Sequence, residues 1–144
     1  MSIFQLFYIS TAVPGFDPKE IQNILRSAHS FNPTYDLTGM MMLRGGIFLQ
    51  LLEGSEENVR MLYSKIKADK RHRNLMVLME RETDHRLFSD WSMAYHEITS
   101  IDLRLINDVL SWKSLVSGKD VDDHKILHFL TLFRNKKFDH PKSS

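Results

Sequence analysis

The residue with the clearest chemical potential is Gln50, which interrupts an apolar run over residues 47–52. Strand alternation places Phe48, Gln50 and Leu52 on one face. A buried amide must find hydrogen-bond partners, because an unsatisfied one costs roughly 1–3 kcal/mol. Its donor and acceptor sit on one rotatable group, so rotation reverses what a neighbouring ligand meets. An edge-strand glutamine facing solvent is an equally open interpretation.

Tyr8 lies in another apolar run, residues 3–10, which is rich in β-forming residues. Alternation places it on the same face as Leu6 and Ser10. Taken alone, Tyr8 is best interpreted as a core aromatic residue whose hydroxyl finds a partner. Beside a redox-active ring, a phenol can instead supply an electron and a proton.

A charge run, Asp69-Lys70-Arg71-His72-Arg73, is the third candidate. Such a run usually marks a solvated helix end, where cations are favoured. It can equally anchor a sugar-alcohol chain or a phosphate. His124 and His128 have metal-compatible spacing but no third ligand, so we interpret them as surface residues.

The elements that position these residues follow from local signals. Residues 3–10 are expected to form a strand, and Asp17-Pro18 to cap a helix that ends at Asn32-Pro33. Two apolar runs, 37–44 and 47–53, flank Gly45-Gly46, which is typical of a tight hairpin.

A second helix is expected after Ser55, followed by strands within 75–79 and 86–98. The order β-α-β-β-α-β with an added fifth strand predicts an α+β, ferredoxin-like fold. From residue 101 the pattern is helical, and a turn centred on Gly118 divides two expected C-terminal helices. We therefore expect a domain over 1–98, a helical extension over 99–135 and a disordered tail over 136–144.

Composition narrows the function classes. The 144 residues, 42% hydrophobic and 26% charged, fit one globular domain. A net charge of +1 gives no reason to expect nucleic acid or a membrane as partner. The chain has no cysteine and its first residues do not resemble a targeting leader, so we expect a cytoplasmic protein. Glycine-rich phosphate loops and hydrolase motifs are absent from the sequence.

Five short motifs, in order and at compatible spacing, resemble the BLUF family (blue-light sensing using flavin) over about residues 2–98. They are Phe7-Tyr8-Ile9-Ser10, Asn32 followed by Leu37-Thr38-Gly39, residues 48–54 (FLQLLEG), Asp69-Lys70-Arg71-His72, and residues 88–93 (FSDWSM). The family fold agrees with the order of elements derived above.

The resemblance implies a flavin held between the two helices, over the sheet. Tyr8 and Gln50 would be the photoactive pair. The resemblance further implies that Asn32 would hydrogen-bond the ring and that Ile24 and Ile66 would make apolar contacts with it. Asp69, Arg71 and His72 would lie near its ribityl and phosphate end. Trp91 and Met93 would relay the signal from the last strand, where both would face the same way.

The resemblance also implies a non-enzymatic photoreceptor with FAD as the expected flavin, FMN or riboflavin being possible. Light would move an electron and then a proton from Tyr8 to the flavin. Gln50 would rotate or tautomerise, and a new hydrogen bond to the flavin C4 carbonyl would shift absorption to the red. Because no effector domain is expected in this chain, output would pass to a separate protein or a homo-oligomer.

The sequence departs from the family pattern at Phe31, where many relatives have a polar residue, and at Ala28-His29-Ser30. These positions leave the flavin type and the recovery kinetics open. A flavin-dependent or hydrolytic enzyme on the same fold is the alternative, although residues 11–16 lack the arginine that an acylphosphatase would need. A light-insensitive ligand-binding regulator is a third possibility.

Overall fold

The first strand, β1 (Ile3–Ala12), is buried on both faces for most of its length, so it must lie inside a sheet that is covered on both sides. The computed structural model describes residues 2–107 and 110–134. In it β1 pairs antiparallel with β3 (Ile47–Gly54) and with β4 (His72–Thr83). β2 (Thr38–Arg44) pairs antiparallel with β3, and β5 (Ala94–Glu97) adds parallel to β2.

The strand order is β4-β1-β3-β2-β5, so the predicted ferredoxin-like arrangement with a fifth strand is confirmed. The β2–β3 hairpin turns at Gly45 and Gly46, whose φ angles of 54° and 80° lie in the left-handed region. Consecutive positive φ values are typical of a type I′ turn, which favours glycine. This turn fixes the register of β3, and with it the position of Gln50.

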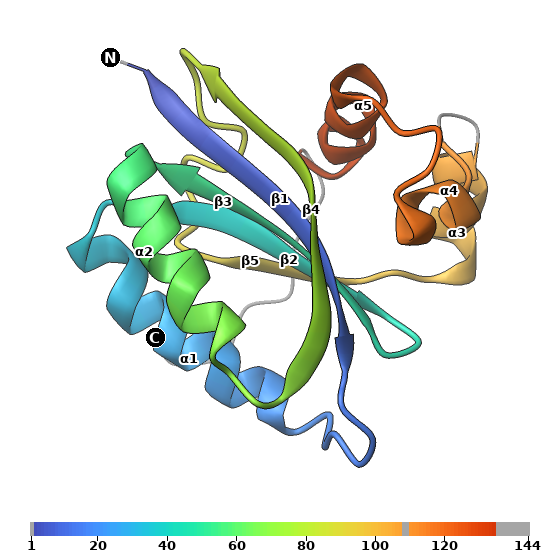
Figure 1. The fold of residues 1–144 in the computed structure, drawn as a ribbon, viewed down its shortest axis with the longest axis horizontal. Helices are drawn as coiled ribbons and strands as arrows, with labels where there is room; N and C mark the ends of the chain where they lie inside the picture. The colour runs from blue at the N-terminus through green and yellow to red at the C-terminus, as the bar shows by residue number, and fades with distance from the viewer. Residues whose placement is uncertain (1, 108–109, 135–144) are drawn as a thin grey trace.

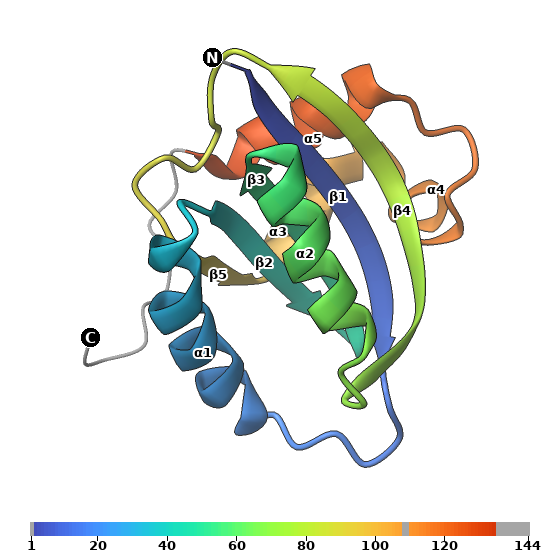
Figure 2. The ribbon, with the colours of Figure 1, turned by 60° about the vertical axis from the view of Figure 1, so that its left-hand side comes forward.

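Helices cover both faces of the sheet (Figures 1 and 2). On one side lie α1 (Glu20–Thr34) and α2 (Glu56–Lys67). On the other lie α3 (Ser100–Asn107), α4 (Trp112–Ser117) and α5 (Asp123–Arg134). In the described part of the chain, none of these helices is long and apolar enough to cross a bilayer.

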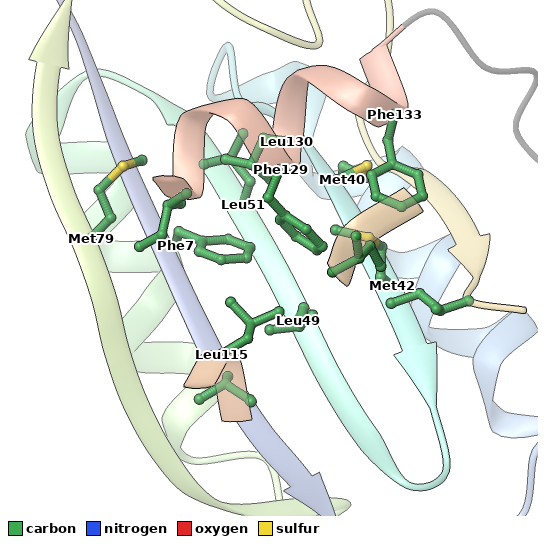
Figure 3. Packing of buried hydrophobic residues seen from close by; sticks show 14 of the residues in the cluster. Phe7, Met40, Met42, Leu49, Leu51, Met79, Leu115, Phe129, Leu130 and Phe133 are labelled. Atoms are coloured by element: carbon green, nitrogen blue, oxygen red, sulfur yellow. The ribbon is translucent and has the colours of Figure 1, made fainter. Parts of the chain in front are cut away.

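Each face of the sheet has its own hydrophobic core, because alternate strand residues point to opposite sides. Phe7, Leu49 and Leu51 belong to the core under α4 and α5, which we call the helical-layer core. Figure 3 shows Phe129 and Leu130 of α5 among these sheet residues. The second core, between the sheet and α1/α2, contains Leu6, Tyr8, Phe48, Leu52 and Met93, and we call it the cleft-side core.

Several sequence-based boundaries were wrong. The described C-terminal residues form three helices, not two, because the Ser111 hydroxyl caps a short extra helix that ends at Gly118 with φ 70°. The first helix begins at Glu20 rather than at Asp17, and Pro33 is accommodated in its last turn. The tail predicted over 136–144 lies outside the described residues.

Candidate functional site

A cleft of about 300 Å³ lies between α1 and α2, on the sheet face that carries Tyr8 and Gln50. This volume is at the small end of the range for ligand pockets, roughly 300–1,000 Å³. Its lining residues come from both helices, from β1, β2, β3 and the start of β4, and from the segments that follow α2 and precede β5. They are Tyr8, Ile24, Ser27, Ala28, Phe31, Asn32, Met41, Phe48, Gln50, Leu62, Lys65, Ile66, Asp69, Arg71, His72 and Met93.

Tyr8 and Gln50 face each other across the β1–β3 pair, directly opposite in register. The Tyr8 hydroxyl donates a hydrogen bond to Gln50 Oε1, and Gln50 Nε2 donates to Met93 Sδ at 3.5 Å. Gln50 is buried, so the alternative of a solvent-facing glutamine is wrong. The three residues form a continuous hydrogen-bonded row along the cleft.

The environment of Tyr8 keeps its hydroxyl protonated. Burial raises the pKa of the phenol well above its ordinary value of about 10, and the nearby Tyr63 and Asp69 raise it further. Tyr63 of α2 lies against it, with ring centroids 5.3 Å apart. Tyr8 is therefore a hydrogen-bond donor to Gln50 at neutral pH.

Asn32 offers an acceptor that the protein itself does not use. Its Nδ2 donates to the Ser92 carbonyl at 2.7 Å, which fixes the direction of the amide. Its Oδ1 is buried and has no hydrogen-bond partner among the described residues. A buried acceptor without a hydrogen bond destabilises the folded protein unless a ligand donates to it. An oxidised flavin ring carries one N–H donor among several acceptors, so the cleft fits the ring that the sequence predicts.

The predicted apolar contacts also come together here. Ile24 of α1 and Ile66 of α2 both line the cleft and are partly buried. A cleft with one aliphatic side chain from each helix suits a flat aromatic ring. Their contact with a flavin remains a prediction.

Asp69, Arg71 and His72 of the charge run line the same cleft, but the protein already uses these groups. Arg71 pairs with Asp69 at 2.6 Å, and this contact lowers the pKa of the Asp69 carboxyl despite its partial burial. The two His72 ring nitrogens lie 2.8 Å from Ser10 Oγ and 2.6 Å from the Ile66 carbonyl. His72 therefore ties β4 to β1 and α2 and forms part of the cleft wall.

The prediction that Trp91 and Met93 share a facing on the last strand was wrong. Both precede β5, in a segment of turns and bends where strand alternation does not apply. Met93 is buried in the cleft-side core, whereas Trp91 packs against the helical-layer core. The segment 91–93 thus contacts the packing on both faces of the sheet.

Sequence reasoning missed two residues that hold this segment. A His29 ring nitrogen lies 3.0 Å from the Met93 carbonyl, next to the Asn32 contact with Ser92. Glu53 of β3 is fully buried and anchors the preceding loop. The available signal for Glu53 was an acidic residue inside an otherwise apolar strand, which requires buried partners.

Comparison with known proteins agrees with this geometry. Residues 3–94 match the BLUF family, described as sensors of blue-light using FAD. The chain is 30% identical over 98% of its length to photoactivated adenylate cyclase subunit alpha of Euglena gracilis. It is 36% identical over 64% of its length to the blue light- and temperature-regulated antirepressor BluF of Escherichia coli K12. It spans only 14% and 22% of those two relatives.

Two solved structures extend the comparison to the fold. BlsA in its photo-activated state superposes with a TM-score of 0.82 at 23% identity, over 96% of this chain and 99% of that one. BlrB, a BLUF protein in its dark state, gives 0.71 at 25% identity, over 91% and 96%. The match over residues 3–94 covers well over half of the sequence, and the cleft retains a buried acceptor for the ring. The chain therefore belongs to the BLUF family of flavin-based blue-light sensors.

Proposed function

We propose that this chain is a blue-light photoreceptor in which Tyr8 and Gln50 are the photoactive pair and FAD is the flavin, FMN or riboflavin being possible substitutes. The observation that carries the proposal is the hydrogen-bonded row from Tyr8 through Gln50 to Met93 beside a cleft of ring size. When bound, an oxidised flavin supplies blue-light absorption and accepts electrons. The remaining steps belong to the protein.

Binding is assigned to three groups of the cleft. Ile24 and Ile66 supply apolar surface from opposite helices, and Asn32 Oδ1 supplies the free acceptor. Asp69, Arg71 and His72 lie near the expected ribityl and phosphate end. Asp69 already compensates the charge of Arg71. Arg71 therefore contributes to ligand binding by shaping the wall of the cleft more than by its net charge.

The switch is assigned to the Gln50 amide. In the described arrangement Oε1 accepts from Tyr8 and Nε2 points to a thioether sulfur, which is a weak acceptor. Rotation of the amide exchanges Oε1 and Nε2, so it gives up both the bond from Tyr8 and the weak contact to Met93, and it changes which hydrogen-bonding group faces the cleft. Tautomerisation would instead change the donor and acceptor roles of these atoms without moving them. Once Tyr8 had given up an electron to the bound flavin, its phenol would become strongly acidic, and release of its proton through the hydrogen bond to Gln50 Oε1 would couple the phenol to this change.

The relay is assigned to Met93 and Trp91. Met93 touches the amide directly, and Trp91 packs against the layer formed by α3, α4 and α5. The Trp91 carbonyl also accepts from Gly39 N of β2 at 3.2 Å. We propose that loss of the Gln50–Met93 contact shifts this segment and alters the helical layer. A separate downstream protein or a homo-oligomer would then read the change, since the relatives include a light-regulated cyclase and an antirepressor.

Substitution of Gln50 tests the proposal. Gln50→Leu keeps approximate volume and removes both hydrogen-bonding functions, so the protein should stay yellow but lose the long-lived red-shifted state. The readout is the absorption difference spectrum after a blue pulse. Gln22→Leu, at an exposed position of α1, is the matched control. A normal, slowly decaying shift in Gln50→Leu would refute the assignment. A wild type that stays colourless when supplied with flavin would favour a hydrolytic enzyme or a regulator that binds another ligand.

A further inference from the structure

His29 of α1 lies against the segment that precedes β5. Its Nε2 atom is 3.0 Å from the carbonyl oxygen of Met93. A carbonyl oxygen only accepts, so this ring nitrogen carries a proton and donates, and it does so in the neutral and in the protonated ring alike. Nearly one turn later in α1, Asn32 Nδ2 donates to the carbonyl of Ser92 at 2.7 Å. Two side chains on one face of α1 therefore hold two successive peptide groups of this segment.

Met93 is held from two directions. Its sulfur accepts from Gln50 Nε2 at 3.5 Å inside the cleft-side core, and its carbonyl accepts from His29 of α1. The first contact is weak because a thioether sulfur is a poor acceptor, whereas the second has the length of an ordinary N–H···O bond. The next residue, Ala94, begins β5 and pairs with Met40 of β2. The bond from His29 thus lies at the junction between the relay segment and the sheet.

The two contacts of Met93 respond differently to a change at Gln50. Reorientation of the Gln50 amide removes the contact with the sulfur directly. The bond from His29 does not involve Gln50, so it persists until the Met93 peptide moves away from α1. A shift of the segment relative to α1 must therefore break this bond, and the bond forms again when the segment returns. His29 consequently stabilises the dark arrangement relative to the shifted one.

We propose that His29 is a positioning residue that shortens the lifetime of the light state by drawing the Met93 peptide back to α1. The inference rests on the proposed relay through Met93. His29 does not line the cleft, so its loss should change how long the light state lasts and leave the size of the spectral shift unchanged. His29 also lies in the stretch 28–30, where the sequence departs from the family pattern. The effect is therefore expected of this chain in particular.

Two substitutions of His29 separate the donated bond from the packing of the ring. His29→Phe keeps a flat ring and removes the donor, so the red-shifted absorption after a blue pulse should decay about two- to tenfold more slowly, the range expected for one hydrogen bond. His29→Gln places an amide N–H near the position of Nε2 and should recover at close to the wild-type rate. His124→Phe, at an exposed position of α5, is the matched control. In flavin-free protein kept in the dark, hydrogen exchange over residues 88–94 should be faster in His29→Phe than in His29→Gln.

Recovery of His29→Phe at the wild-type rate would overturn this role, as would slow recovery that His29→Gln does not restore, because ring packing would then be responsible. Equal exchange in the two flavin-free variants would also overturn it. If His29→Phe does not fold, nitrogen-15 NMR of wild type decides. The Nε2 signal of His29, assigned by its loss in His29→Gln, should change on illumination and return with the spectrum, and an unchanged signal would overturn the role. A wild type that shows no red shift would instead refute the proposed function itself.

Discussion

Glu53 provides a sharp test of how the β4–β5 loop is held beside the flavin cleft. Its carboxylate is fully buried and accepts four hydrogen bonds. Oε1 accepts from Phe88 N at 3.0 Å and Thr38 Oγ1 at 3.1 Å. Oε2 accepts from Leu87 N at 2.6 Å and Gln5 Nε2 at 2.7 Å. Glu53→Gln keeps the shape but replaces one acceptor oxygen with a donor.

The cost can be worked out from these partners. If the new NH₂ group takes the place of Oε2, Gln5 can turn its unpartnered Oε1 toward it, but Leu87 N–H is left facing a donor. If it takes the place of Oε1, the Thr38 hydroxyl can accept, but the Phe88 N–H then faces a donor in place of its acceptor. Either orientation sets one backbone N–H, that of the partly buried Leu87 or of the buried Phe88, against another donor. The free energy of unfolding should therefore fall by about 1–3 kcal/mol.

Urea unfolding followed by circular dichroism measures this change. Glu80→Gln is the control, because Glu80 pairs with Arg60 at the exposed surface, where solvent screens the pair and its loss should cost much less than the loss of a buried partner. Hydrogen exchange at the Leu87 and Phe88 amides should also become faster in Glu53→Gln. Surface substitutions usually change the free energy of unfolding by no more than about 0.5 kcal/mol. If Glu53→Gln changes it by no more than that, the backbone N–H groups of Leu87 and Phe88 do not depend on the Glu53 carboxylate.

Two further predictions concern the photoactive row. Tyr8→Phe should still bind flavin, because ring volume is nearly unchanged, but absorption spectra should show no reversible red shift; a normal photocycle yield would rule out Tyr8 as the donor. Met93→Ala should leave most of the spectral shift, since Met93 Sδ is only a weak acceptor for Gln50, while light-dependent hydrogen exchange over residues 100–134 becomes smaller. Identical exchange responses in Met93→Ala and wild type would count against Met93 as the relay.

Local sequence signals predicted the features that depend on short segments of the chain, such as turns, helix caps and strand faces. The Gly45-Gly46 pair specified the hairpin, and Ser55 caps α2 by accepting from Asn58 N at 3.2 Å. Strand alternation predicted that Tyr8 shares a face with Leu6, and Gln50 with Phe48 and Leu52, and these residues do lie in one core because β1 and β3 are regular there. The family motifs supplied the roles of these residues, which alternation alone left open.

The features that sequence reasoning missed depend on contacts between distant segments. The facing of Trp91 and Met93 failed because the chain turns before β5, with Trp91 N bonded to the Phe88 carbonyl at 3.1 Å. The ring nitrogens of His72 contact Ser10, 62 residues away, and the Ile66 carbonyl. No periodicity in the sequence encodes such contacts. The sequence therefore predicted which residues line the cleft better than it predicted the hydrogen bonds that these residues make.

The two-sided sheet has a consequence for how such a sensor can change over time. Gln50 stands between Leu49 and Leu51, and Tyr8 between Phe7 and Ile9, so the immediate chain neighbours of the photoactive pair pack into the opposite core. Residues that face the flavin cleft and residues that face the helical layer therefore alternate along the same strands. Substitutions in one set can accumulate while the other stays constant. A lineage, or a protein engineer, can thus exchange the helical cover of the sheet and keep the light-absorbing side.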